Sequence, residues 1–146
     1  MKTVEHAGVV YWYGDCAVGD TPNGRSTATG AIRRIQSRGM RGLRVLDMCA
    51  GIGLIGLTML KILGHDIIGC LVLADINIFN VDAMRLTIER NGIKNVEAIL
   101  SDGLTNISST RHQTVRCISR MQTRFEYDYW SGKTLRKYAM VPPRYL

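Results

Sequence analysis

Three aspartates, each placed after a short apolar run, carry the strongest chemical signal in this sequence. Asp47, Asp75 and Asp102 are 28 and 27 residues apart, which is the repeat length of a strand–helix–strand unit. Right-handed crossovers bring the carboxyl ends of parallel strands to one edge of a sheet, and ligands bind at that edge in open α/β folds. We therefore expect the three carboxylates to line one binding edge.

A glycine-rich turn follows the first of these aspartates. Gly51, Gly53 and Gly56 fit the G-x-G-x-x-G fingerprint of dinucleotide sites, and Asp75 follows Gly56 by 19 residues, where a ribose-binding acid is expected. A pyrophosphate, however, needs the bare positive end of the helix, and Asp47 stands four residues before Gly51. A ligand with positive charge, such as the sulfonium and ammonium of S-adenosylmethionine, is better matched to that carboxylate.

The elements that must position these residues follow from the apolar periodicity and its stop signals. The predicted fold is α/β, with an incomplete, Rossmann-like, doubly wound parallel sheet of three strands. Those strands are Leu43–Asp47, Cys70–Asp75 and Val96–Leu100, and the one candidate for a fourth is Thr114–Ser119. One helix is expected from the glycine turn to Leu63, with Gly64 as its stop; a second is capped by Asn77 or Asn80 and closed by Asn91 and Gly92.

The flanking residues are less regular, and they suggest three segments. Residues 1–42 form an N-terminal segment, residues 43–107 the ligand-binding core, and residues 108–146 a basic tail. Within the first segment we expect a short strand at Gly8–Tyr13, a loop from Gly14 to Gly30 and a helix at Thr29–Arg38.

Three stretches of the core resemble the motifs of a known family, the class I S-adenosylmethionine-dependent methyltransferases. Leu46–Gly53 resembles motif I, with Cys49 where many members have the first glycine. Val72–Asn77 resembles the second motif, whose acid accepts hydrogen bonds from the ribose hydroxyls, and Leu100–Gly103 resembles the third, whose acid meets the adenine amino group. From Leu46 to Gly103 the three stretches span about 60 residues, in the family's order and spacing.

Within that class, the amino-acid sequences of the motifs are most similar to those of the small-domain methyltransferases. This branch includes the release-factor glutamine methyltransferases and the guanine-N2 methyltransferases of ribosomal RNA. The resemblance implies an enzyme that transfers a methyl group from S-adenosylmethionine to a nitrogen of RNA or protein. The cofactor-binding residues that it implies are Asp47, Cys49, Gly51 and Gly53 around the methionine portion, Asp75 and Ile76 at the ribose, and Asp102 and Gly103 at the adenine.

The sequence departs from that branch after Asp102. An Asn-Pro-Pro-aromatic motif, which positions the nucleophilic nitrogen in the branch, is expected within about 20 residues, but the only Pro-Pro is Pro142-Pro143. No catalytic residue is therefore assigned, and the catalytic half is expected to be missing or divergent. One alternative is a truncated or catalytically silent protein that binds the cofactor weakly. A second is a dinucleotide-binding oxidoreductase or a nucleic-acid-binding module.

Composition and charge constrain the partners. Residues 1–109 carry a net charge of +1 and residues 110–146 a net charge of +6, so the tail is a candidate for non-specific contact with nucleic acid. No apolar run reaches the roughly 20 residues that span a bilayer, so we expect a cytoplasmic protein without membrane contact.

The four cysteines are scattered, which predicts buried thiols and no metal site. An unpaired edge beside Leu43–Asp47 would favour self-association, unless residues 115–118 pair with it.

Overall fold

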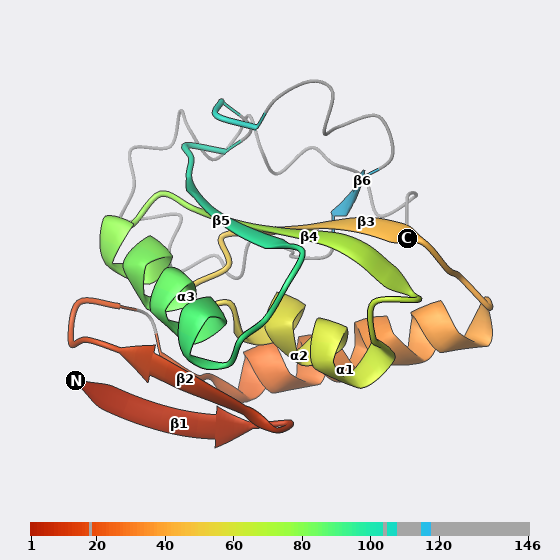
Figure 1. The fold of residues 1–146 in the computed structure, drawn as a ribbon, viewed down its shortest axis with the longest axis horizontal. Helices are drawn as coiled ribbons and strands as arrows, with labels where there is room; N and C mark the ends of the chain where they lie inside the picture. The colour runs from red at the N-terminus through yellow and green to blue at the C-terminus, as the bar shows by residue number, and fades with distance from the viewer. Residues whose placement is uncertain (18, 104, 108–114, 118–146) are drawn as a thin grey trace.

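A parallel β-sheet forms the centre of the molecule (Figure 1). The structure is a computed structural model, and it describes residues 1–17, 19–103, 105–107 and 115–117. The sheet has the strand order β5-β4-β3-β6. Its strands are β3 (Leu43–Met48), β4 (Ile68–Asp75), β5 (Val96–Leu100) and β6 (Val115–Cys117). The predicted α/β class and the three predicted strands are confirmed, each strand to within two residues at either end.

The described helices lie together on one face of this sheet (Figure 1). They are α1 (Pro22–Ser37), α2 (Leu54–Leu63) and α3 (Ile78–Arg90). Since the chain moves from β3 to β4 to β5 in one direction across the sheet, right-handed crossovers place α2 and α3 on the same side. α1 packs against α2. Gly64, with a φ of +77°, ends α2, and Asn77 caps α3 through the N–H of Phe79, as the stop signals predict.

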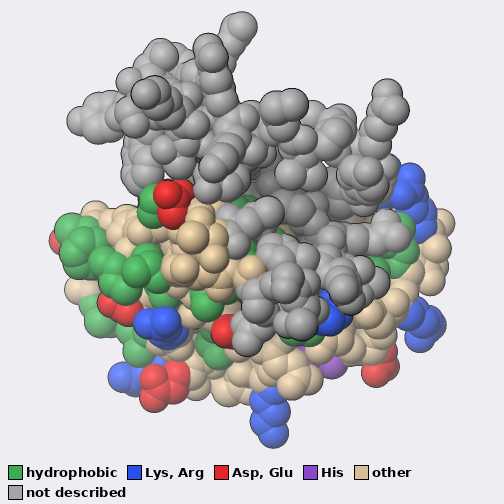
Figure 2. All heavy atoms as spheres, turned by 90° about the horizontal axis from the view of Figure 1, so that it is seen from above, with side chains coloured by type: hydrophobic (Ala, Val, Ile, Leu, Met, Phe, Trp, Pro, Cys, Tyr) green, Lys and Arg blue, Asp and Glu red, His purple; other side chains and the backbone are tan. Residues whose placement is uncertain are grey.

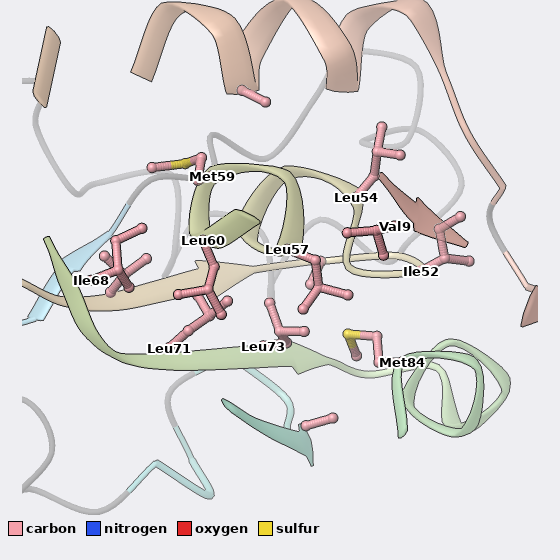
Figure 3. Close-up of a cluster of buried hydrophobic side chains, with 14 of the residues drawn as sticks. Val9, Ile52, Leu54, Leu57, Met59, Leu60, Ile68, Leu71, Leu73 and Met84 are labelled. Carbon is pink, nitrogen blue, oxygen red and sulfur yellow. The ribbon is translucent and has the colours of Figure 1, made fainter. Parts of the chain in front are cut away.

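The main core lies between the helices and the sheet. In Figure 3, Leu57 and Leu60 of α2 point toward Leu71 and Leu73 of β4, and Met84 of α3 joins them from the side. All five side chains are buried. Burial of such side chains supplies most of the stabilisation of a domain of this size, at about 1.5–3 kcal/mol for each large aliphatic side chain. The core therefore anchors the two helices that begin at the carboxyl edge of the sheet.

A β-hairpin forms a further layer below the helices (Figure 1). β1 (Lys2–His6) pairs antiparallel with β2 (Val9–Tyr13), and the two residues between them have φ angles of +52° and +72°, as a type I′ turn requires. The amide of Asn91, at the end of α3, bonds both backbone groups of Val10, at 3.1 Å and 2.7 Å. The predicted strand at residues 8–13 is confirmed as β2.

The first helix starts seven residues earlier than predicted. The expected loop from Gly14 to Gly30 ends at Thr21, whose hydroxyl accepts the N–H of Gly24 and caps the helix, while Pro22 takes the first helical position. A capping threonine followed by proline is a helix-start signal. The polar, glycine-containing composition of residues 19–30 obscured it.

The second face of the sheet carries its own buried cluster. Leu46, Val72 and Ala74 pack there with Ile107. β6 pairs with β3 in parallel, from Arg44 with Val115 to Leu46 with Cys117. The expected pairing of residues 115–118 with β3 is thus confirmed over three residues, and Ile118 lies outside the described residues. Along Arg44–Leu46 the edge of β3 is covered, so self-association through that edge is not supported. No helix among the described residues is long and apolar enough to cross a membrane.

Candidate functional site at the carboxyl edge of the sheet

The predicted edge is assembled around the turn between β3 and α2. Cys49, Gly51 and Gly53 all have positive φ, at +56°, +57° and +82°, so the backbone of this turn repeatedly enters the left-handed region. Glycine adopts that region without steric cost, whereas Cys49 pays roughly 1–2 kcal/mol for it. This conformation explains why the motif favours small residues at alternate positions. It also turns the amide groups of the loop toward the neighbouring strand end.

Asp47 sits beneath the first turn of α2. Its side chain is fully buried, and Oδ2 accepts the backbone N–H of Gly56 at 2.9 Å. Gly53, the N-cap of α2, has no side chain that can accept a hydrogen bond, so Asp47 supplies an acceptor to the helix start instead. A carboxylate therefore stands at the positive end of α2, where a dinucleotide fold would hold a pyrophosphate. This geometry opposes the dinucleotide alternative.

Gly56 allows α2 to approach β4 and the carboxylate of Asp47 closely. A Cβ at this position would lie 2.6 Å from Cδ2 of Leu73 and 3.2 Å from Oδ2 of Asp47. The third glycine of the fingerprint thus serves helix–sheet packing.

Asp75 joins the ends of β4 and β3. Its Oδ2 accepts the N–H of Gly51 at 2.8 Å, and its Oδ1 accepts the N–H of Asn77 at 2.9 Å. The residue is buried, with 7% of its surface exposed. Its backbone oxygen accepts the N–H of Ser101, which brings the end of β5 alongside. The three predicted strand ends therefore meet, as the spacing of the aspartates implied.

The remaining predicted residues lie at the open side of this edge. Ile76 is 40% exposed, directly after Asp75. Asp102 is exposed, and Gly103 is half-buried with a φ of +57°. The turn at Asp102 is held by Ser101, whose hydroxyl donates to the carbonyl of Gly103 at 2.6 Å. All eight predicted cofactor-binding residues thus occupy one edge of the sheet, on three successive strand ends.

The cysteines differ from the expectation. Cys16 and Cys49 are exposed and Cys70 is half-buried, so the prediction of buried thiols is wrong for these residues. Cys49 is exposed because it belongs to the turn that leaves β3. Within the described part of the chain, no group of three or more histidine, cysteine or acidic side chains is placed to hold a metal ion.

A buried tyrosine connects the hairpin to this edge. The hydroxyl groups of Tyr11 and Thr58 lie 3.2 Å apart, and both side chains are buried. Burial raises the pKa of Tyr11 to about 12; the hydrogen bond with Thr58 opposes the rise, and the nearby charges of Asp20 and Asp47 add to it. The charges of Asp20 and Asp47, from different segments, therefore both act on one neutral phenol.

The family resemblance assigns Asp15–Thr21 to a loop over the methionine end of the cofactor, and the structure places this segment beside the edge, before α1. The amide of Asn77 donates to the backbone oxygen of Cys16 at 3.0 Å, and the guanidinium of Arg25 bonds both carboxylate oxygens of Asp20. The Arg25 guanidinium lowers the pKa of Asp20, against the opposing effect of burial. No pattern in the sequence links Cys16 to Asn77, 61 residues away. The Asp20–Arg25 pair was hidden in a stretch that was interpreted as loop.

Charge is dispersed over the described surface. On the face shown in Figure 2, the Lys and Arg side chains are spread around the rim, with Asp and Glu side chains between them. This agrees with the net charge of +1 over residues 1–109. The expected basic contact with nucleic acid falls on the tail, nearly all of which lies outside the described residues.

Comparison with protein families identifies this edge. The family model described as "Methyltransferase small domain" matches residues 31–117, which is more than half of the chain. The match runs through all eight predicted cofactor-binding residues. It confirms the resemblance that the three motifs predict, and S-adenosylmethionine is the methyl donor of that family. No curated protein sequence matches the chain significantly.

Solved structures share the fold. A 16S rRNA N2 methyltransferase (RsmC) from T. thermophilus, in complex with AdoMet and guanosine, is 20% identical with a TM-score of 0.57; the match covers 74% of this chain and 29% of that one. A ribosomal protein L11 methylase from Lactobacillus delbrueckii subsp. bulgaricus is 22% identical with a TM-score of 0.51, over 63% of this chain and 44% of that one. The chain thus spans less than half the length of these structures.

Proposed function

The chain belongs to the small-domain methyltransferase family, and we propose that it binds S-adenosylmethionine along the carboxyl edge of β3, β4 and β5. We further propose that it takes part in methyl transfer to a nitrogen of RNA or protein. The observation that carries the first proposal is the carboxylate of Asp47 at the start of α2, bonded to Gly56. It favours a cationic ligand in the place where a phosphate would otherwise bind.

The donor groups at the edge fit this cofactor. An ionised carboxylate has about four lone-pair sites, and the described N–H groups take two of them on Asp75. The remaining sites suit the two hydroxyls of a ribose. Ile76 presents an exposed apolar side chain next to them, and the exposed carboxylate of Asp102 can accept the adenine amino group. These roles are assigned by the family resemblance and are compatible with the exposure of each side chain.

The chemistry of the bound donor is simple, because its methyl group is carried on a sulfonium, an excellent leaving group. The protein must then align the acceptor and exclude water from it. In this chain, Asp75 bonds Gly51 within the glycine turn and Asp47 bonds Gly56 in the first turn of α2, so the turn that would face the methionine portion is held before the ligand arrives. Such preorganisation lowers the cost of binding.

Support for a nitrogen acceptor comes from two sources. The motifs are most similar to a branch that methylates glutamine or guanine nitrogens, and the T. thermophilus neighbour is an N2 methyltransferase. One observation favours the silent alternative, in which the cofactor binds without transfer. No Asn-Pro-Pro motif follows Asp102 within the next 20 residues. In the branch that the sequence resembles, this motif holds the nucleophilic nitrogen.

Labelled methyl donor tests both proposals. The 146-residue chain is incubated with methyl-tritiated S-adenosylmethionine alone, with total RNA and with ribosomal proteins. We expect label to be retained on the folded chain and, after transfer, to be recovered on a base or side-chain nitrogen in digests. Retention without transfer would favour the silent alternative. Label on carbon or oxygen would refute the nitrogen assignment, and absence of retention would refute cofactor binding.

A further inference from the structure

One segment of the described chain departs from the dispersed distribution of charge. Residues 21–46, which comprise α1, the turn after it and the start of β3, contain six arginines and no acidic residue. The rest of residues 1–109 contains five basic and ten acidic side chains. The small net charge of residues 1–109 therefore hides a separation, with an excess of positive charge on this segment and an excess of negative charge elsewhere.

Four of these arginines are exposed on the second half of α1 and directly after it. They are Arg33, Arg34, Arg38 and Arg41. Among the residues that the structure describes, no acidic side chain pairs with Arg33, Arg38 or Arg41. Arg34 and Arg38 are one helical turn apart, where like charges repel each other. The helix dipole favours a cation in the last turn of α1, but it does not account for arginines at all four positions. Most of this charge is therefore available to an anionic partner.

The outward side of α1 is also open at its centre. Gly30 is exposed, and no atom lies within 4 Å of the position that its Cβ would take. Glycine inside a helix costs about 0.5–1 kcal/mol relative to alanine, and no close packing requires it at this position. Arg33 and Arg34 follow Gly30 by three and four residues, so they flank it on the helix surface. An anionic chain could accordingly approach the helix backbone at Gly30, between two guanidinium groups.

This surface leads away from the proposed cofactor edge. The first turn of α1 packs at the end of the glycine turn, since a Cβ on Gly24 would lie 3.0 Å from Cδ2 of Leu54. At a rise of 1.5 Å per residue, Arg33 lies about 14 Å along the helix from Gly24, and Arg38 about 21 Å. α1 lies on the helix side of the sheet, below it in Figure 1, whereas Figure 2 views the molecule from above. A polymer with its modified group at the edge could therefore extend along α1.

From this arrangement we propose that the arginine face, defined as Gly30, Arg33, Arg34, Arg38 and Arg41, binds the phosphate backbone of RNA, and that RNA is the methyl acceptor. The planar guanidinium group matches the oxygens of a phosphate and can bind two of them at once. A protein acceptor has no regular array of negative charges to match this face. The choice of acceptor rests on the proposed function, whereas the binding of RNA by the arginine face does not require the cofactor.

Titration of a short, labelled, single-stranded RNA of mixed sequence at several salt concentrations tests this inference by fluorescence anisotropy. The variant of the full chain carries Arg33→Gln, Arg34→Gln and Arg38→Gln, because glutamine preserves helix propensity. We expect the affinity for RNA to fall roughly 10- to 100-fold at low salt. The slope of log affinity against log salt should fall by about 2, since each lost phosphate contact contributes about 0.7 on a single strand.

A second triple variant provides the matched control. Arg85→Gln, Arg90→Gln and Lys94→Gln remove three exposed positive charges from α3 and the turn after it, so the net charge falls by the same amount. The affinity of this variant for RNA should change less than about threefold at the same salt concentration. The basic tail is identical in all three proteins, so its contribution to RNA binding cancels in the comparison. Far-ultraviolet circular dichroism verifies that both variants keep their helices.

The outcomes separate this inference from the proposed function. An equal loss of RNA affinity in the two triple variants would overturn the inference, because net charge alone would then determine binding. Tighter binding of polyglutamate than of RNA, lost in the α1 variant, would also overturn it and would indicate an acidic protein partner. Label recovered on protein instead of RNA in the transfer experiment would overturn the choice of acceptor. Failure of the wild-type chain to bind S-adenosylhomocysteine would refute the proposed function, while the RNA titrations would still decide whether the arginine face binds RNA.

Discussion

At the scale of single residues, the site depends on carboxylates whose oxygens also organise the backbone. Asp75 accepts the N–H groups of Gly51 and Asn77, and Asp47 accepts that of Gly56. Each aspartate therefore has a structural role in addition to the binding role that we propose for it. The spacing of these residues in the sequence predicts that they share an edge, but it contains no information on the bonds through which they shape the turn.

Tyr11 gives a prediction at the same scale. Its pKa of about 12 exceeds the ordinary value of 10.0, so the folded chain holds the phenol proton more tightly than the unfolded chain does. Its contribution to stability is then fully present below pH 10 and is lost as the pH rises toward 12, by about 2–3 kcal/mol in total. Chemical denaturation of wild type and Tyr11→Phe at several alkaline pH values measures this loss.

The phenylalanine variant isolates the effect of Tyr11 from the other groups that titrate at high pH. At neutral pH, Tyr11→Phe should be less stable by about 1 kcal/mol, because Thr58 loses its partner. The difference between the two proteins should shrink and then reverse above pH 10. A difference that stays constant up to pH 12 would show that Tyr11 ionises as an ordinary tyrosine.

At the scale of elements, the close contact between α2 and the sheet is the most demanding feature. Gly56→Ala places a methyl group 2.6 Å from Leu73, in a core without room for it, and should destabilise the chain by about 1–3 kcal/mol. Gly30→Ala provides the matched control, since this helical glycine has no atom within 4 Å of its would-be Cβ. That variant should gain about 0.5–1 kcal/mol.

Thermal or chemical unfolding of the two alanine variants checks this pair of expectations. Changes of opposite sign in the free energy of unfolding would support the packing role of the third glycine. Equal changes would indicate that helix propensity alone determines the effect at both positions, and that α2 can move away from β4 without cost.

The elements differ in how well the sequence predicts them, for physical reasons. β3, β4 and β5 were predictable because buried parallel strands are near-continuous apolar runs, bounded here by glycine, asparagine and aspartate. β1 was not, because its two-stranded sheet leaves most of its side chains exposed and its residues other than Val4 are polar or charged. The start of α1 was missed because its cap and first turn contain threonine, asparagine and glycine, which also favour loops.

Two long-range hydrogen bonds near the site could not be predicted from the sequence, for another reason. Asn91 binds Val10 across 81 residues, and Asn77 binds Cys16 across 61. Asparagines at helix ends are already explained by capping and chain reversal, so their types give no sign of a distant partner. Long-range hydrogen bonds of this kind depend on how the hairpin docks, which local patterns do not encode.

At the scale of the whole molecule, the described residues form layers that together position the carboxyl edge of the sheet. The hairpin packs on the helices, the helices pack on the sheet, and the sheet brings three aspartates together (Figure 1). The residues before β3 add contacts at both sides of the glycine turn, through Asn77 and through Leu54. The N-terminal segment therefore contacts the same edge of the sheet on which the three motifs lie.

Calorimetric titration of the 146-residue chain with S-adenosylhomocysteine and with NAD tests the central claim most directly. We predict that S-adenosylhomocysteine binds more tightly than NAD, because Asp47 occupies the helix start that a pyrophosphate would need. Asp75→Asn, which removes the charge but keeps one acceptor oxygen, should weaken S-adenosylhomocysteine binding roughly 10- to 100-fold. Tighter binding of NAD, or a change below about twofold in Asp75→Asn, would contradict the account.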